Sequence, residues 1–244
     1  MFGGAGYYRK KKGAYESIFA AHFDGTNDLI RNTSSLPVST EQQGTFSFWL
    51  IPTATGLSYR GTALCFRGNG ATNGSHFRVY NTGLGMDFFC RGKSAVGLGT
   101  YNVANTFNIN QWNHVVYSYD FTSPGYMMAA VNGVLELNTT PTLGNHHQSG
   151  RVSIGDNEAG GRRWRADTAL MWFDSVFVDL SVQANIDKFY SATNPVGKFG
   201  SDGSTPLGSQ PLIFLKGHPN FQTNFGSWSN FTVTGSLTQG AALP

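Results

Sequence analysis

Trp112-Asn113-His114-Val115-Val116-Tyr117-Ser118-Tyr119-Asp120 is the stretch that decides the fold of this chain. Large apolar or aromatic side chains recur at every second position from Val115 to Phe121, which is the period of a β-strand with one face in a core. The segment therefore predicts a strand, and its neighbours in the sequence extend that prediction to a sheet.

The next feature along the chain is a hairpin. The apolar runs 127–131 and 134–137 flank Asn132-Gly133. An Asn-Gly pair between two such runs is the strongest short-range hairpin signal, because a type I′ turn needs positive φ at both central residues.

Two further segments read as strands, and one reads as a helix. Residues 45–50 alternate, with Phe46, Phe48 and Leu50 on one face, and residues 173–180 carry large apolar side chains on both faces, as in a central strand. A helix is predicted over residues 181–192, with Ser181 as its N-cap. One helix among many strands predicts an all-β sandwich or barrel.

The composition fits this fold class. The chain has 244 residues, enough for one all-β domain with a sizeable core. Charged residues make up 13%, against roughly a quarter in ordinary globular proteins. Aromatic residues make up 14%, and 31 glycines favour short strands joined by tight turns. The net charge of +3 is too small to imply a nucleic-acid partner.

The N-terminal residues 1–20 have no helix or strand periodicity, so we expect a basic arm that is flexible or reaches a neighbouring subunit or an acidic surface. Its candidate assembly contacts are Tyr7, Tyr8, Arg9, Lys10, Lys11 and Lys12. No apolar stretch follows this basic run, so no secretory signal is expected. No window approaches the roughly 20 apolar residues of a membrane span, so no membrane insertion is expected either.

Residues 195–244 differ in composition from the strand-rich part, residues 21–194. They are rich in turn-forming residues, with short strands expected at 211–215 and 230–234. We expect a C-terminal extension that completes the sandwich or docks on a neighbour. The two cysteines, Cys65 and Cys90, both lie in strand-like contexts and are expected to be buried and free, although a disulfide across a hairpin is the alternative.

In this order, the segments resemble the concanavalin A-like (laminin-G-like) jelly-roll family over about residues 20–194. The matching residues are Phe23-Asp24-Gly25 with Asp28, Ser47-x-Trp49-x-x-Pro52, Trp112-x-His114-Val115 with Tyr119-Asp120, Val131-Asn132-Gly133, Ile154-Gly155 and Asp174-x-Val176. Ser175 departs from the pattern, since the family often has an acid there. The resemblance implies an antiparallel two-sheet jelly-roll sandwich with a short helix after its last strand.

A looser resemblance concerns the tail. Residues 200–211 and 231–238 are similar to C-terminal segments on jelly-roll proteins of tailed bacteriophages. This resemblance implies a structural virion component, either a capsid decoration or a tail-associated protein. Such a protein is assembled in the host cytoplasm with other virion proteins and copies of itself. The alternative is a carbohydrate-binding module or adhesin that recognises host surface glycans.

Enzymatic activity is not expected. The same fold houses glycoside hydrolases, which need two carboxyl groups about 5 to 9.5 Å apart. The four glutamates, Glu16, Glu41, Glu136 and Glu158, are scattered over separate segments, and the one strand-like acid pair, Asp156-x-Glu158, lies in a glycine-rich turn. A glycoside hydrolase is therefore a remote alternative, and no cofactor other than calcium is expected.

Two groups of residues are candidate binding sites. Calcium needs several oxygen ligands, and the candidates are Asp24, Asp28, Asp156 and Glu158. The alternative for Asp24 and Asp28 is an Asx turn, in which the side chains bond backbone amides. For a sugar or an interface the candidates are Arg162, Arg163, Trp164, Arg165 and, more weakly, Trp228. The alternative is a core tryptophan with solvated arginines around it.

Overall fold

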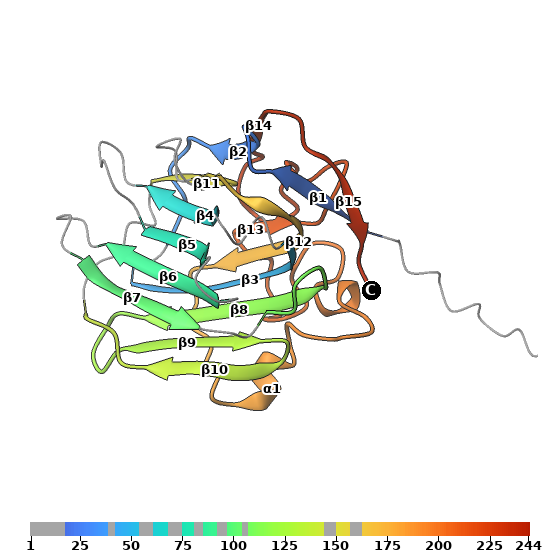
Figure 1. Ribbon diagram of the computed structural model, residues 1–244. Coiled ribbons are helices and arrows are strands. Elements are labelled where there is room, and N and C mark those ends of the chain that lie inside the picture. The colour runs from blue at the N-terminus through green and yellow to red at the C-terminus, as the bar shows by residue number, and fades with distance from the viewer. Residues whose placement is uncertain are drawn as a thin grey trace, which may run out of the picture.

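The computed structural model describes residues 18–38, 42–53, 61–67, 75–80, 85–91, 97–103, 107–143, 150–156 and 163–244. Within them the chain forms two antiparallel sheets (Figure 1). The eight-stranded sheet has the order β10 (Val134–Thr139), β9 (Tyr126–Val131), β8 (Asn113–Asp120), β3 (Gln43–Pro52), β12 (Arg165–Asp174), β1 (Phe19–Asp24) and β15 (Thr238–Ala242), with β13 (Ile213–Leu215) also on β12. The seven-stranded sheet has the order β14 (Thr232–Thr234), β2 (Leu29–Asn32), β11 (Arg151–Ile154), β4 (Gly61–Arg67), β5 (Ser75–Tyr80), β6 (Gly85–Arg91) and β7 (Gly97–Val103).

The main core lies between the two sheets. Alternate residues of β3 and β8 enter it, as the sequence predicted: Phe46, Phe48, Leu50, Val115, Tyr117, Tyr119 and Phe121 are all buried there. The side chains between them point to the other face of the sheet, because successive residues of a strand alternate. Trp49 and Val116 accordingly belong to a second core. The prediction of an all-β, two-sheet jelly-roll sandwich is confirmed.

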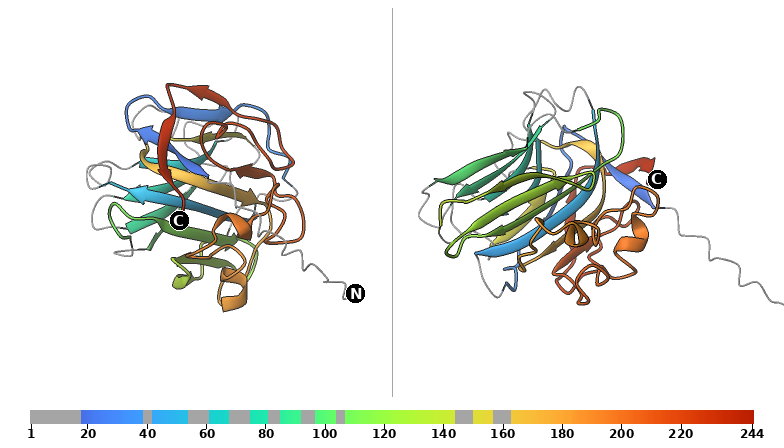
Figure 2. Two further views of the ribbon diagram at one scale, coloured as in Figure 1. Left: turned by 90° about the vertical axis from the view of Figure 1, so that its right-hand side faces the viewer. Right: turned by 90° about the horizontal axis from the view of Figure 1, so that it is seen from below.

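The second core covers the outer face of the eight-stranded sheet. The segment that follows β12 lies along this face (Figure 2), and it contributes Leu180, Ile186, Phe189, Phe199 and Phe214. These side chains pack on outward-facing residues of the sheet, including the fully buried Trp172, whose Nε1 donates to the carbonyl of Gly203. The eight-stranded sheet is therefore buried on both faces over much of its area.

The hairpin of β9 and β10 has the geometry that its sequence predicts. Asn132 has φ 50° and Gly133 has φ 84°. The side chain of Asn132 also accepts a hydrogen bond of 2.8 Å from the backbone N–H of His114, which ties the turn to β8. The prediction of an Asn-Gly turn with positive φ at both residues is confirmed.

After residue 170 the predicted short helix is present, but its bounds and its N-cap were wrong, and so were the bounds of the predicted strand. The helix α1 spans only Gln183–Ile186, and the extended Val182, rather than Ser181, stands at its N-cap. Ser181 instead donates its N–H and its hydroxyl to Asp179, in a local turn that keeps the preceding residues out of the helix. The strand expected at 173–180 ends at Asp174, so the central strand is β12, which lies further towards the N-terminus.

The C-terminal segment completes both sheets. β13 pairs with β12, β15 pairs with β1, and β14 pairs with β2. Residues 195–244 therefore complete the sandwich, which is one of the two outcomes expected for them. At the other terminus β1 begins at Phe19, inside the range expected to be an arm, and the predicted assembly contacts at residues 7–12 lie outside the described residues.

The remaining features are the cysteines, a short 3-10 helix and the absence of a membrane-spanning helix among the described residues. Cys65 is buried in β4, whereas the side chain of Cys90 lies outside the description, so their redox state stays a prediction. A short 3-10 helix spans Val196–Lys198. None of the helices that the structure describes is long and apolar enough to cross a membrane.

Candidate functional site

Some members of each group of candidate residues meet at one rim of the sandwich. This rim is built from the β1–β2 turn, the two ends of the β11–β12 connection, the start of β12 and the β14–β15 turn, and we call it the charged rim. Its members are Asp24, Asp28, Asp156, Arg163, Arg165 and Ser236. Residues that are more than 200 positions apart in sequence are thus joined by direct hydrogen bonds, as between Asp28 and Ser236.

The β1–β2 turn is shaped by its two aspartates. Asp24 Oδ1 accepts a hydrogen bond of 2.6 Å from the N–H of Thr26. The backbone N–H of Asp24 in turn donates to Asp28 Oδ2, at 3.0 Å. The bond from the backbone of Thr26 lowers the pKa of the exposed Asp24 carboxyl below its usual value. This segment therefore forms an Asx turn, which the sequence analysis gave as the alternative to a calcium site.

Asp28 links this turn to the C-terminal segment. It is only 3% exposed, and its Oδ1 accepts a hydrogen bond of 2.9 Å from the N–H of Ser236. Gly235 has φ +88°, and a Cβ there would lie 2.6 Å from Asp28 Oδ1, so glycine is required for this close approach. Both oxygens of Asp28 are thus occupied by backbone donors.

An ion pair between a half-buried arginine and a buried aspartate forms the next part of the rim. Arg163 Nε lies 3.3 Å from Asp156 Oδ2, and Asp156 is 2% exposed. The neighbouring Gly155 packs so tightly that a Cβ would lie 2.7 Å from the backbone oxygen of Asp28. The ion pair therefore joins the two ends of the β11–β12 connection, and Gly155 packs that connection against the β1–β2 turn. Arg162 and Glu158 lie outside the described residues.

Trp164 and Arg165 point to opposite faces of β12. Trp164 is 2% exposed, packs edge-on to Phe48 at 6.3 Å and donates from Nε1 to Thr168 Oγ1 at 2.8 Å. Trp164 is therefore a core residue, and it cannot stack on a surface ligand as first considered. Arg165 is exposed and stands opposite Asp24 in the β1–β12 pairing. The aliphatic part of its side chain packs against Gly25.

Trp228 lies apart from these residues. It is half-buried, packs edge-to-face on Phe231 at 5.6 Å and contacts the main core. Its backbone oxygen accepts a hydrogen bond of 2.9 Å from Asn224 Nδ2. These contacts make Trp228 an anchor of the C-terminal segment.

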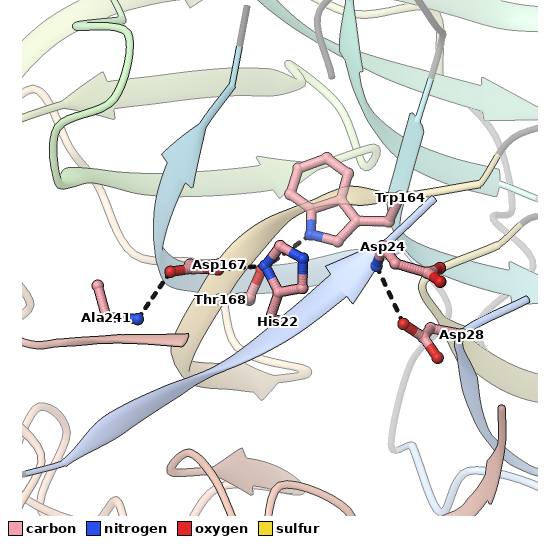
Figure 3. Close-up of polar contacts among 7 residues, drawn as sticks. All are labelled: His22, Asp24, Asp28, Trp164, Asp167, Thr168 and Ala241. Atoms are coloured by element: carbon pink, nitrogen blue, oxygen red, sulfur yellow. Dashed lines mark hydrogen bonds and ion pairs between the residues drawn. The ribbon is translucent and has the colours of Figure 1, made fainter. Parts of the chain in front are cut away.

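Sequence reasoning missed a second pair next to the rim, His22 and Asp167. His22 Nδ1 lies 2.6 Å from Asp167 Oδ1, and Asp167 Oδ2 accepts a hydrogen bond of 2.7 Å from the N–H of Ala241 (Figure 3). The patterns His22-x-Asp24 and Arg165-x-Asp167 contain a usable signal, because residues i and i+2 of a strand share a face. The sequence pattern does not show that β1 pairs with β12, and that pairing is what places His22 opposite Asp167.

The described residues contain no group of three His, Cys, Asp or Glu side chains that could hold a metal ion. Asp28 is occupied by two backbone donors, and Asp156 is paired with Arg163. Two of the four residues considered for calcium are thus already engaged. Calcium binding by a set that includes Glu158 stays a prediction.

The family model described as the concanavalin A-like lectin/glucanases superfamily matches residues 24–173. The match covers more than half of the chain, so this protein belongs to that superfamily. The charged rim begins at the first matched residue, Asp24, and extends beyond the matched range to Ser236. No curated protein matches the chain in sequence.

Solved structures that are similar in fold include the following two. A native heptameric SAP-like pentraxin from Limulus polyphemus has a TM-score of 0.61 at 15% identity, over 92% of this chain and 95% of the pentraxin chain. A putative carbohydrate binding protein from Bacteroides ovatus has a TM-score of 0.57 at 14% identity, over 93% of this chain and 60% of its own. At such identities the likeness shows the fold alone.

Proposed function

We propose that this protein is a non-enzymatic carbohydrate-binding protein whose ligand contacts the charged rim. The observation that carries this proposal is the exposed pair of Asp24 and Arg165, which face each other across β1 and β12. The superfamily contains lectins, and the similar Bacteroides ovatus protein is described as a putative carbohydrate binding protein. Both facts support the proposal.

The chemistry of the pair suits a polyhydroxylated ligand. A sugar hydroxyl can donate to a carboxylate and accept from a guanidinium, and Asp24 and Arg165 supply one of each. Both are already positioned: Asp24 by the N–H of Thr26, and Arg165 by packing of its stem against Gly25. Positioned groups lose less side-chain entropy on binding, which favours affinity.

The proposal excludes hydrolysis, because a glycosidase needs two carboxyl groups free to act on one bond. At the rim Asp28 and Asp156 are buried and engaged with backbone or arginine partners. Glu136 lies on β10, the opposite edge of the eight-stranded sheet from β15. These observations support a binding role for the carboxylates of the rim.

The test is an array of immobilised bacterial and animal glycans, probed with the wild-type protein with and without calcium. We expect binding to a defined set of glycans. Arg165→Ala should weaken it at least about tenfold, as expected for a lost charged hydrogen bond. The matched control is Lys188→Ala, an exposed cation outside the rim, which should bind like the wild type. A silent array under both conditions would overturn the proposal.

A structural role in a bacteriophage virion is a second proposal. It rests on the resemblance of residues 200–211 and 231–238 to the tails of phage jelly-roll proteins. A displayed jelly roll can also bind glycans, so the two roles are compatible. Mass spectrometry of purified particles tests this role, and absence of the polypeptide from the particles contradicts it.

A further inference from the structure

The imidazole of His22 is held in one orientation at the edge of the charged rim. Its Nδ1 lies 2.6 Å from Asp167 Oδ1, and Figure 3 shows the ring on β1 turned towards Asp167 on β12. A carboxylate can only accept hydrogen bonds, so Nδ1 carries the proton in this contact. In the neutral ring the other nitrogen, Nε2, is then a hydrogen-bond acceptor.

Asp167 is itself fixed from its other side. Its Oδ2 accepts a hydrogen bond of 2.7 Å from the N–H of Ala241 in β15. The backbone of β15 approaches the carboxylate so closely that a Cβ on Gly240 would lie between 2.6 and 2.8 Å from its atoms. Both oxygens of Asp167 thus form hydrogen bonds within the protein, one with His22 and one with Ala241. Asp167 therefore orients His22 and does not itself contact a ligand.

The Nε2 edge of His22 lies on the same face as the proposed sugar contacts. Ala21 and Phe23 enter the main core, so His22 and Asp24 project from the outer face of β1. Their pairing partners on β12 are Asp167 and Arg165. The side chain of His22 is 39% exposed and that of Asp167 16%, so the oriented ring meets solvent while its support is largely covered.

We propose that His22 Nε2 is a third ligand contact, which accepts a hydrogen bond from a hydroxyl group of the bound carbohydrate. This inference rests on the proposed function and extends its site from Asp24 and Arg165 along β1. Asp167 acts as a positioning residue, because it sets the tautomer and the direction of the ring. The result is an acceptor and a carboxylate two residues apart on β1, with a guanidinium opposite the carboxylate on β12, all on one sheet face.

The competing explanation is purely structural: the His22–Asp167 pair helps to hold β15 on the sheet. His22→Asn separates the two explanations. The asparagine amide can still donate to Asp167 from a position close to that of Nδ1, but it has no atom in the place of Nε2. A structural role survives this substitution, whereas a ligand contact through Nε2 is lost.

The experiment is calorimetric titration with the glycan that binds best on the array. We expect His22→Asn to weaken binding about three- to tenfold, the equivalent of one neutral hydrogen bond. The matched control is Glu136→Gln, an exposed residue on the opposite edge strand β10, which should bind like the wild type. Urea unfolding of both variants confirms that they are folded.

Equal binding by His22→Asn and the wild type would overturn this inference and leave the glycan-binding proposal intact. Loss of binding in both variants alike would also overturn it. Nitrogen-15 NMR of the wild type gives an independent reading. We expect the tautomer with the proton on Nδ1, and the tautomer with the proton on Nε2 would contradict the proposed acceptor. If no glycan binds the wild type, the proposed function fails and this inference with it.

Discussion

Among single residues, His114 shows how burial controls chemistry in this fold. It is fully buried on β8, where its ring packs against Trp49 at 5.1 Å and Tyr190 at 5.6 Å. Its Nε2 lies 2.8 Å from Ser47 Oγ. Burial disfavours the charged ring and lowers the pKa of His114 to about 3. The histidine of the strand that decides the fold is therefore a neutral packing residue.

This burial predicts a defined pH dependence of stability. Below its ordinary pKa of 6.5, His114 binds a proton in the unfolded chain but not in the folded one. The free energy of unfolding should therefore fall by about 1.4 kcal/mol per pH unit from about pH 6.5 down towards pH 3. Above that window His114 makes no pH-dependent contribution.

Urea unfolding of the wild type and of His114→Gln at pH 7 and pH 5 measures this effect. Glutamine retains a nitrogen that can reach Ser47 but does not titrate. Between these two pH values the wild type should lose about 2 kcal/mol more than the variant. An identical loss in the two proteins would show that His114 is protonated in the folded state.

Asp28 carries a second prediction at this scale. Its two oxygens bind the N–H groups of Asp24 and Ser236 in a nearly dry position. Asp28→Ala should lower the free energy of unfolding by about 2 to 4 kcal/mol, because two backbone N–H groups lose their bonds to a buried, charged partner. Asp24→Ala, at an exposed site, is the control and should cost less than about 1 kcal/mol. Chemical denaturation compares the two, and equal losses would contradict the linking role of Asp28.

At the scale of elements, the β9–β10 hairpin depends on its glycine for two reasons. Gly133 has φ +84°, and a Cβ there would lie 2.5 Å from Cδ1 of Tyr190. Gly133→Ala should therefore add a steric clash to the usual cost of positive φ, for a total of about 2 to 3 kcal/mol. Gly208→Ala is the control, because Gly208 has φ +80° with nothing within 4 Å. It should cost only about 1 kcal/mol, and equal thermal shifts in the two variants would contradict the clash.

Local signals in the sequence were sufficient for this hairpin and for the alternating faces of β3 and β8. They were insufficient where long-range contacts set the conformation. β12 has a register shift after Ala169, and Leu170 adopts φ 50° while bonding to the carbonyl of Lys216. The local propensities of residues near position 170 carry no information about this hydrogen bond to Lys216. The extent of the central strand was therefore predicted poorly.

The same limit applies to the site. The acids and the arginines of the charged rim were identified as two separate groups, because their meeting depends on the pairing of β1 with β12. The sequence identified Arg163 and Asp156 as candidate residues but did not predict their ion pair. It also did not decide whether Trp164 lies in the core or on the surface. His22 and Asp167 were missed, since neither belongs to a recognisable motif.

At the scale of the whole molecule, residues 195–244 are part of the sandwich. They supply three strands, and Phe199 and Phe214 of the second core. A chain truncated after Asn194 should lose cooperative unfolding and bind a hydrophobic dye, because Trp172 and Phe189 would be uncovered. Differential scanning calorimetry with the full chain as reference tests this. An unchanged, cooperative transition would show that the extension is separable.

The central claim is that a carbohydrate binds at the charged rim. Its most direct test is a crystal structure of the protein with the glycan selected on the array. We predict the sugar within hydrogen-bond distance of Asp24 and Arg165, with one hydroxyl at His22 Nε2. A glycan bound anywhere else on the molecule, with the charged rim unoccupied, would contradict the account.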